Sequence, residues 1–380
     1  MKNANHFGPP QEPPTSSTPP GAAGAEPGDN PRVRVEERHE RIERISEAFE
    51  RIFYRGSLLL TGISLVAALA QWTFQDRYPI LRTIFYALPR PLLAILFLIL
   101  AIWWLSQARL PLGVLCLAGA VAFTFSWRVN DFSATTVAGC EGVKPIRIVF
   151  WNVARPGELP EIRPRLEEIR RLDPDIIAIV EATTEVSITA DRPADRAKKL
   201  GKAFRDEWSA ALTGYQYRIL PDGMVIAAKG TVRLVGWEEL GKATRLATAQ
   251  VVTRDGIIRL LLADVDANPF LSRAPILHAI EKASRNVREP VIVAGDFNTP
   301  RDSVQFDMLE RSGFSQAFEL AGSGHRSTWP VPVPLMALDH VWLRGIEPCT
   351  VELEQSELSD HKRIVVDLRP RVTRPGRSPR

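Results

Sequence analysis

Polar side chains able to do chemistry stand beside short apolar runs in the second half of this 380-residue sequence. The pairs are Ile146–Trp151 with Asn152, Ile176–Val180 with Glu181, Val291–Ala294 with Asp296 and Asn298, Val341–Leu343 with Asp339, and Ile364–Leu368 with Asp360 and His361. Carboxylate and amide oxygens form a hard donor set that suits Mg²⁺ or Mn²⁺. One imidazole beside carboxylates adds a group that titrates near neutral pH. The sequence holds no Gly-rich phosphate loop, serine-nucleophile motif or Cys/His zinc spacing.

The elements that must position these groups form an α/β pattern over residues 144–368. Between the first two strand-like runs, Ile162, Leu166 and Ile169 recur at helical spacing, and a second helical stretch includes Ile276 and Ile280. A segment of this length is enough for one well-packed domain. The sequence therefore predicts one α/β domain with its polar groups at strand ends.

Together and in this order, these segments resemble the endonuclease/exonuclease/phosphatase superfamily, which includes deoxyribonuclease I, exonuclease III, abasic-site endonucleases, neutral sphingomyelinases and inositol polyphosphate 5-phosphatases. The matching segments are Trp151-Asn152, Pro174–Glu181, Gly295–Pro300, Leu338–Val341 and Ser359–His361, with Thr328-Trp329-Pro330 as a further similarity. The resemblance implies a four-layer α/β sandwich, in which two mixed sheets pack face to face and helices cover them. It also implies that the site lies where the strand-end loops meet.

The resemblance implies a metal site as well. Glu181 would ligate the divalent metal, Mg²⁺ or Mn²⁺, with Asn152 and Asp360 adjacent to it.

The remaining family roles fall on four residues. Asp296 would position or deprotonate the attacking water, and Asn298 would hold a phosphate oxygen. His361, oriented by Asp339, would donate to the phosphate as its charge rises. Such an arrangement suits phosphoester hydrolysis, because an anionic ester repels a nucleophile until nearby cations neutralise it. Whether Asp296 or the His361 pair acts as the base stays open.

The sequence departs from the family where a strand usually ends in His. Asp266, or as second choice Asp264, occupies that place here. An ionised carboxylate would repel a phosphate, so this Asp binds a second metal, stays protonated, or marks an altered or lost activity. For the second acidic metal ligand of the family, Asp222 is the nearest candidate. His278 is expected to face solvent, and His325 is a weaker candidate for reaching the site.

The overall composition, with 45% apolar and 24% charged residues, does not represent the two ends of the sequence, which differ strongly from the rest. Residues 1–31 contain eight Pro and almost no large apolar side chain, so we expect a disordered tail. Residues 32–55 predict an amphipathic juxtamembrane helix. Residues 369–380 carry five Arg and no acid, so they account for the net charge of +4 and leave about −1 elsewhere. The high pI is therefore no indication of a nucleic-acid surface.

Three charge-free apolar runs, Gly56–Gln75, Pro91–Ala108 and Leu110–Trp127, predict three transmembrane helices within residues 56–128. Trp residues near their ends are typical of interfacial belts. Seven Arg precede the first run and Arg109 separates the last two, against three Arg in the first loop. The positive-inside rule then predicts a plasma (inner) membrane protein with a cytoplasmic N-terminus and an extracytoplasmic catalytic domain.

That topology gives the three cysteines different expectations. Cys116 lies inside the third run and should be a buried free thiol. Cys140 and Cys349 would both lie in an oxidising compartment. The family-like sheet would bring their segments together, so we expect a Cys140–Cys349 disulfide, with two independent thiols as the alternative.

We therefore expect a membrane-anchored, metal-dependent phosphodiesterase or phosphatase. Its substrate is a phosphate ester, either nucleic acid or a phospholipid head group, and its second partner is the bilayer. A nuclease needs a basic groove, whereas the basic stretch Lys198–Arg205 has the period of a solvated helix face. The alternative function is a catalytically silent domain of the same fold that binds a phosphorylated ligand or protein.

Overall fold

The structure, a computed structural model, describes residues 31–134, 140–156, 159–182, 206–241 and 243–370. The predicted Pro-rich tail except Pro31, most of the basic C-terminal tail and the basic stretch before Asp206 lie outside the described residues. The chain divides into two compact units, Met1–Leu59 and Leu60–Arg380. In the first unit, helix α1 (Pro31–Leu69) shows exposed Ile42, Ile45, Phe49 and Ile52. α1 also continues without a break past residue 55, where the sequence analysis placed a boundary.

The apolar region of the second unit contains η1 (Ala70–Phe74), α2 (Pro79–Ala87), α3 (Arg90–Ser106) and α4 (Leu110–Asp131). Two helical stretches, Arg38–Phe74 and Leu110–Asp131, are long and apolar enough to cross a membrane. A third span exists if α2 and α3, bent by 76° at their junction, count as one. The structure thus holds two or three candidate spans where the sequence predicted three.

Two mixed six-stranded sheets make up the body of the α/β domain. The first has the order β13 (Pro348–Glu354), β14 (Arg363–Leu368), β2 (Ile146–Asn152), β3 (Ile176–Val180), β5 (Val225–Ala228), β4 (Gln216–Ile219). The second has the order β10 (Ser315–Gln316), β12 (Asp339–Arg344), β9 (Val291–Asp296), β8 (Gly256–Asp264), β7 (Arg245–Thr253), β6 (Val232–Glu239). The neighbours β2–β3 and β8–β9 are parallel, and the other pairs in both sheets are antiparallel.

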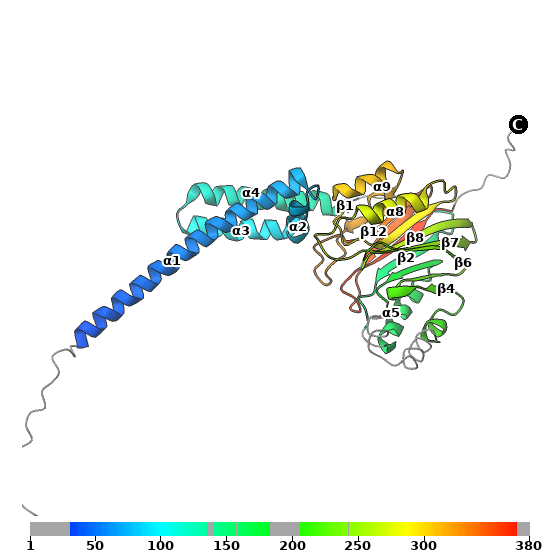
Figure 1. Cartoon of the computed structure of the whole chain (residues 1–380), viewed down its shortest axis with the longest axis horizontal. Coiled ribbons are helices and arrows are strands. Elements are labelled where there is room, and N and C mark those ends of the chain that lie inside the picture. The colour runs from blue at the N-terminus through cyan, green and yellow to red at the C-terminus, as the bar shows by residue number, and fades with distance from the viewer. Residues whose placement is uncertain (1–30, 135–139, 157–158, 183–205, 242, 371–380) are drawn as a thin grey trace, which may run out of the picture. The chain divides into compact units, whose positions relative to one another are not determined.

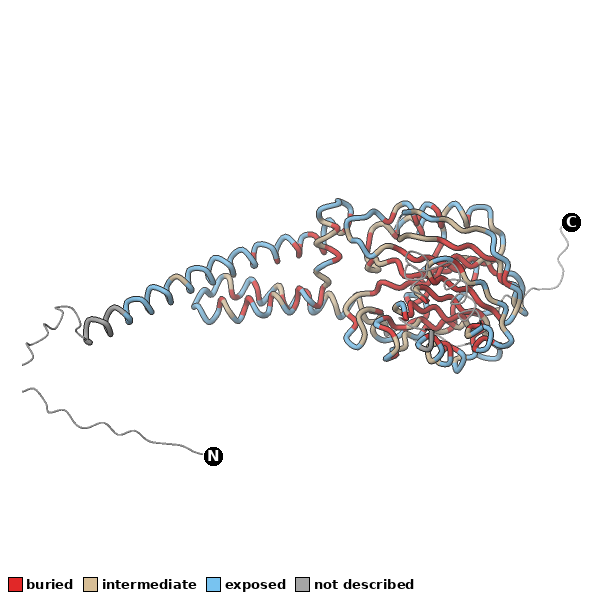
Figure 2. Tube along the Cα trace, turned by 60° about the horizontal axis from the view of Figure 1, so that its bottom comes forward, coloured by how far each residue is buried: buried red, intermediate tan, exposed pale blue. Residues whose placement is uncertain are grey.

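The two sheets pack face to face because their strands alternate in the side chains they present. Ile148 and Phe150 of β2 point into the core shared with Leu260, Leu262 and Ile292. Val149 and Trp151, which alternate with these two residues, face the other way. Buried residues are accordingly concentrated in the strands (Figure 2).

Helices cover the outer face of each sheet, which completes the four layers (Figure 1). α5 (Leu159–Arg171) buries Ile162, Leu166 and Ile169 against the first sheet. α8 (Ala274–Ser284) and α9 (Asp307–Arg311) bury Ile276, Leu309 and their neighbours against the second. The smaller elements are η2 (Pro221–Gly223), η3 (Val304–Phe306), α10 (Ala317–Ala321) and the pair β1 (Phe132–Ala134) with β11 (Ser323–His325). The predicted α/β sandwich is confirmed.

A disulfide joins Cys140 to Cys349, with the Cα atoms 5.3 Å apart, as expected. Cys349 lies within β13, a strand that the sequence analysis did not identify. Cys116 in α4 is a buried free thiol, as expected from the sequence.

Candidate active site

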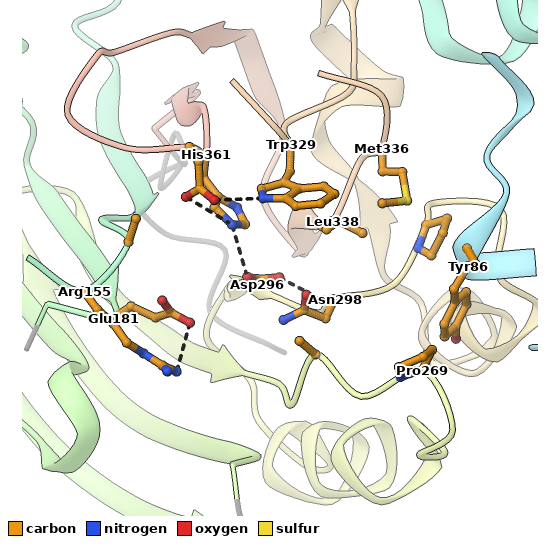
Figure 3. A pocket seen from close by; sticks show the side chains of 15 residues that line it. Tyr86, Arg155, Glu181, Pro269, Asp296, Asn298, Trp329, Met336, Leu338 and His361 are labelled. Atoms are coloured by element: carbon orange, nitrogen blue, oxygen red, sulfur yellow. Dashed lines mark hydrogen bonds and ion pairs between the residues drawn. The ribbon is translucent and has the colours of Figure 1, made fainter. Parts of the chain in front are cut away.

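A pocket of about 490 Å³ opens where strand ends from both sheets meet (Figure 3). β2, β3 and β9 end at this edge, and β12 begins there. The pocket is lined by Tyr86, Ala87, Ala154, Arg155, Glu181, Ala267, Pro269, Asp296, Asn298, Pro300, Trp329, Met336, Leu338, Asp360 and His361. The strand ends therefore bring Glu181, Asp296, Asn298, Asp360 and His361 to one cavity.

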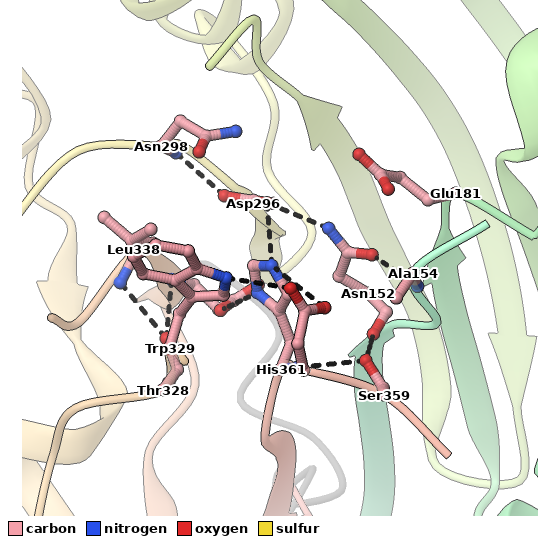
Figure 4. Close-up of polar contacts among 12 residues, drawn as sticks. Asn152, Ala154, Glu181, Asp296, Asn298, Thr328, Trp329, Leu338, Ser359 and His361 are labelled. Atoms are coloured by element: carbon pink, nitrogen blue, oxygen red, sulfur yellow. Dashed lines mark hydrogen bonds and ion pairs between the residues drawn. The ribbon is translucent and has the colours of Figure 1, made fainter. Parts of the chain in front are cut away.

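Asp296 is the best-held side chain of the site. It ends β9, is 1% exposed, and its two carboxylate oxygens accept hydrogen bonds from Asn298 N (2.8 Å) and Asn152 Nδ2 (2.9 Å) (Figure 4). The preceding Gly295 is required because a Cβ there would lie 2.4 Å from the Ala263 carbonyl oxygen on β8. Asn298 also donates from Nδ2 to Val265 O (2.7 Å). The Asp296 carboxylate is thus fixed by the side-chain amide of Asn152, at the end of β2, and by the backbone N–H of Asn298, in the loop after β9.

His361 is held between carboxylates. Its Nδ1 is 2.8 Å from Asp339 Oδ2, and its Nε2 lies 3.9 Å from Asp296 Oδ2. Ser359 anchors the same turn, because its hydroxyl donates to Asn152 O and accepts from His361 N. The ring is therefore clamped on its Asp339 side and faces Asp296 across a short gap.

Electrostatics follows from this burial. Burial alone would lower the pKa of His361, but Asp339, Asp296 and Asp360 raise it to about 10. Burial raises the pKa of Asp296 well above its usual range, Asp339 adds to the rise, and His361 opposes it. His361 is consequently a cation at neutral pH, next to a carboxylate of raised basicity.

Glu181 lies across the pocket, directly after β3. Its Oε1 pairs with Arg155 NH2 at 3.1 Å. Glu181 and Asn298 both adopt positive φ, 57° and 45°. Such backbone conformations are uncommon outside Gly and gather at functional sites. The strained turns aim both side chains into the pocket.

Asp360 is the most exposed member of the set, with 52% of its side chain accessible. Its Oδ2 accepts a hydrogen bond from Trp329 Nε1 (2.9 Å), and Oδ1 lies 4.0 Å from His361 Nε2. Asn152 accepts from Ala154 N at Oδ1 (2.9 Å) while it donates to Asp296. Asp360 therefore lies on the His361 side of the pocket, while Asn152 lies behind Asp296.

The structure separates the two candidates for the missing His. Asp264, the second choice, ends β8 in register with Asp296 and is 4% exposed. Neither aspartate lines the pocket, and Asp266, beyond the end of β8, accepts a hydrogen bond from Asn268 N (2.9 Å). Burial raises the pKa of Asp264 to about 7, with Glu181 adding to the rise and Arg155 and Arg245 opposing it. Asp264, not Asp266, is the carboxyl beside Asp296.

Three other residues considered from the sequence stay outside the pocket lining. Asp222 in η2 forms an ion pair with Arg245. His325 stacks on Phe132, with ring centroids 4.6 Å apart, and His278 is 65% exposed on α8. His278 thus faces solvent as expected.

The donor set fits a divalent cation. Glu181, Asp296 and Asp360 place three carboxylates on the pocket, with Asp264 and Asp339 buried near them. Burial, and after it neighbouring carboxylates, raise the pKa of Asp264 and Asp296, and a cation would stabilise their ionised forms. One ligand atom each from Asp296, Asp339 and His361 also lies within 4.8 Å of the others, close enough to share an ion.

The sequence analysis did not identify Arg155, Tyr86 or Ala87 as site residues, and it noted Trp329 only within a further family similarity. Arg155 and Trp329 each bind a carboxylate of the site, and Arg155 gave no sequence signal beyond following a strand. Tyr86 and Ala87 come from the apolar region, about two hundred residues from Asp296 (Figure 3). No local pattern indicates such a contact.

Several known proteins are similar to parts of this chain. An uncharacterized Escherichia coli K12 protein, YbhP, is 31% identical over 84 residues, which are 21% of this chain and 33% of YbhP. This chain thus matches only a third of that relative's length. The human Nocturnin catalytic domain has 19% identity and a TM-score of 0.43, covering 59% of this chain and 94% of that one. A Bacteroides thetaiotaomicron mannosyl-6-phosphatase has 14% identity and a TM-score of 0.43, covering 59% and 99%.

A family model gives the broadest match. The model of the Endonuclease/Exonuclease/phosphatase family matches residues 150–361, from within β2 to His361. This range holds every residue that lines the pocket from the α/β domain. Because the match covers more than half of the sequence, the chain belongs to the endonuclease/exonuclease/phosphatase family.

Proposed function

We propose that this protein is a membrane-anchored, divalent-metal-dependent hydrolase of phosphate esters. The observation that carries the proposal is the constellation of Asp296, held by Asn152 and Asn298, facing a His361 that is oriented by Asp339. Nucleophilic attack on a phosphate ester needs a base for water and a cation for the phosphate oxygens. The site supplies both within one pocket.

The geometry favours Asp296 as the base. Its raised pKa makes the ionised carboxylate a stronger acceptor for a water proton. His361 is held protonated by three carboxylates, so it donates from Nε2 to a phosphate oxygen rather than accepting. Loss of one such donor typically costs about 3–4 kcal/mol of transition-state stabilisation. Asn298 is placed beside Asp296 to hold a further phosphate oxygen.

We place the metal, Mg²⁺ or Mn²⁺, with Glu181 as ligand and Asn152 and Asp360 as adjacent groups. A ligand set of Asp296, Asp339 and His361 is less suitable, because the Asp339–His361 hydrogen bond orients the imidazole. When bound, the ion would polarise the phosphate and lower the pKa of water. The carboxylate oxygens and the excess of acidic groups support this assignment.

We further propose that α1, α2–α3 and α4 anchor the chain in the plasma (inner) membrane, with a cytoplasmic N-terminus and an extracytoplasmic catalytic domain. The apolar helices and the Arg distribution support it. The Cys140–Cys349 disulfide adds support, because disulfides persist in oxidising compartments.

The test is hydrolysis of bis(p-nitrophenyl) phosphate and p-nitrophenyl phosphate by the full chain in detergent, with Mg²⁺, Mn²⁺ or EDTA. We expect metal-dependent release of nitrophenol that Asp296→Asn and His361→Gln each reduce about a hundredfold or more. Hydrolysis that survives EDTA and both substitutions would contradict the proposal.

The alternative, a silent domain that binds a phosphorylated ligand, is favoured by one observation: no His follows the apolar run of β8, where Asp264 and Asp266 stand instead. The same assay separates the two. If no ester is cleaved while inorganic phosphate still protects the protein against thermal unfolding, the silent domain becomes the better description.

A further inference from the structure

We propose that the ester cleaved by this pocket belongs to a phospholipid head group in the bilayer that anchors the chain. This inference rests on the proposed function and names its substrate class. Water would add to phosphorus, one P–O ester bond would break, and the leaving alcohol would take a proton. The structural basis is that the segment between the first two apolar helices is itself part of the active-site wall.

That wall consists of Tyr86 and Ala87 at the end of α2. In the pocket, Tyr86 and Pro269 lie on the side opposite Arg155 and Glu181 (Figure 3). The cavity is therefore amphipathic. Its Glu181 end carries the charged groups, and Pro269 and Met336 lie toward its Tyr86 end (Figure 3). An ester with a phosphate at one end and an apolar body at the other matches this division.

The wall is fixed to the catalytic domain by a buried carboxylate. Asp76, 1% exposed, accepts hydrogen bonds from Tyr86 OH (2.9 Å), Val304 N (3.0 Å), Gln305 Nε2 (2.7 Å) and the Ser303 hydroxyl. A carboxylate is buried at little cost only when donors satisfy it in this way. Tyr86 is thus positioned through Asp76 by the loop that follows Asp296.

The ends of the apolar helices meet at the same loop. Arg90, the first residue of α3, pairs with Asp302 and with Asp131 at the end of α4 (3.7 Å). Gln75, after η1, donates from Nε2 to Asp302 O (3.0 Å). If these helices span a bilayer, Asp302 marks its surface, and Pro300, two residues before it, lines the same pocket as Asp296 and His361. The reacting groups then lie at head-group level.

Large apolar side chains are exposed beside this wall. Ile80 of α2 is 79% exposed and Phe270 is 68% exposed. The two segments touch, because Arg82 NH1 donates to Phe270 O (3.4 Å). Tyr78 and Leu271 are exposed as well. Exposed aromatic and aliphatic residues next to membrane helices are typical of the membrane interface, where acyl chains would cover them.

Charge argues against a nucleic acid in the same place. Among the described residues that line the pocket, the basic groups are Arg155, paired with Glu181, and His361. A nucleic-acid groove needs several cations free to meet backbone phosphates. A single head group needs only one phosphate subsite, which His361 and Asn298 supply.

The experiment uses the full chain reconstituted in vesicles of phosphatidylethanolamine and phosphatidylglycerol. It compares cleavage of vesicle phosphatidylglycerol with that of glycerophosphoglycerol, the same head group without acyl chains, and of a single-stranded oligonucleotide. We expect the vesicle lipid to be cleaved at least about tenfold faster than either soluble ester. Burial of the Ile80 and Phe270 side chains against acyl chains would strengthen lipid binding by more than about a factor of ten. The Ile80→Ser/Phe270→Ser double variant should lower the lipid-to-soluble ratio about tenfold.

Ile257→Ser is the matched control, because Ile257 is also an exposed apolar residue, with 47% of its surface accessible. It lies at the start of β8, the opposite end of the strand from Asp264, which is the end near the pocket. This variant should leave the ratio unchanged. The lipid assignment would be overturned if glycerophosphoglycerol or the oligonucleotide were cleaved as fast as the lipid. It would also be overturned if the lipid-to-soluble ratio were the same in the double variant. Neither outcome would affect the proposed hydrolase function. No cleavage of any ester, bis(p-nitrophenyl) phosphate included, would overturn the proposed function and this inference with it.

Discussion

Three aspartates stand in one row at the end of the second sheet. Asp264, Asp296 and Asp339 end β8, end β9 and begin β12, and they are paired in register. All three are at most 4% exposed. Buried like charges raise one another's pKa unless a cation intervenes. His361 supplies one cation to this row, and the metal proposed at Glu181 would supply another.

Removing the charge of Glu181 tests the metal assignment. Glu181→Gln should abolish divalent-dependent hydrolysis and leave the fold intact, because it takes a ligand charge from a strand end. Activity on bis(p-nitrophenyl) phosphate and the circular dichroism spectrum are the measurements. Glu167→Gln, an exposed change on α5, should be silent. Full activity in Glu181→Gln would refute the assignment.

The row also predicts a pH effect. Asp264 contributes to the raised pKa of Asp296. Asp264→Asn should therefore lower that pKa and move the acidic limb of the pH–rate profile to lower pH, since Asp296 would be ionised there. Asp266→Asn, two residues away and hydrogen-bonded to Asn268 N, should leave the limb in place. If only the Asp266 variant shifts the profile, the structure has placed the wrong carboxyl beside Asp296.

At the scale of elements, the loop after β9 serves two sites. Residues 296–298 hold the reacting carboxylate, and residues 302–305 bind Asp76, Gln75 and Arg90. Any displacement of α2 would reach Asp296 through a few residues of backbone. In the proposed function, the apolar helices therefore help to position the site as well as anchoring the chain.

Asp76→Ala should destabilise the protein by about 3 kcal/mol, because Tyr86, Ser303, Val304 and Gln305 would lose a buried acceptor. Denaturant unfolding in detergent, followed by Trp fluorescence, measures the change. Asp307→Ala, exposed in the first turn of α9, should cost less than about 1 kcal/mol. Equal stability of the two variants would show that Asp76 does not hold the wall.

A second prediction for the elements concerns His340 in β12. Burial lowers its pKa from 6.5 to about 4, and Nε2 bonds Thr299 O at 2.9 Å. The folded state therefore binds fewer protons, so stability present above pH 6.5 is lost as pH falls toward 4, by about 1.4 kcal/mol per unit. His340→Gln should reduce this loss in thermal unfolding scans between pH 7 and pH 4. Exposed His278→Gln should not.

The elements also show how far sequence reasoning reaches. β2, β3 and β9 could be predicted because each is a short apolar run bounded by polar residues. β13, with two Glu among its residues, and β6, mostly exposed, lack that signal. The strand-end residues of the site followed from the motifs. Tyr86 could not, because tertiary packing alone brings α2 to the pocket.

The choice between Asp264 and Asp266 shows the same limit for the site. Both follow the apolar run of β8, and the sequence does not state where that strand ends. Pairing with β9 places Asp264 opposite Asp296 at the last residue of β8, whereas Asp266 lies two residues beyond the end of that strand. Register depends on the neighbouring strand, so the structure was needed to decide.

At the scale of the whole molecule, the proposed anchoring and the proposed catalysis depend on the same arrangement of elements. The disulfide ties Cys140, which precedes β2, to β13, so it closes a loop of 209 residues that contains every pocket residue of the α/β domain except Asp360 and His361. A bridge of this span contributes on the order of 5 kcal/mol in the chain-entropy account. The benefit exists only where thiols oxidise, which links stability to compartment.

This link makes the topology testable through the cysteines. With an extracytoplasmic catalytic domain, Cys140 and Cys349 are paired and Cys116 is buried, so a membrane-impermeant maleimide should label nothing on intact cells. Prior treatment with an impermeant reductant should let the same reagent label Cys140, which is partly exposed, without lysis. Cys349→Ser should leave the Cys140 thiol free to react without reductant, and should lower the unfolding temperature. If labelling requires lysis and both thiols are free before it, the domain lies in the cytoplasm. Only in that compartment would the disulfide be absent and the impermeant reagent also be unable to reach the cysteines in intact cells.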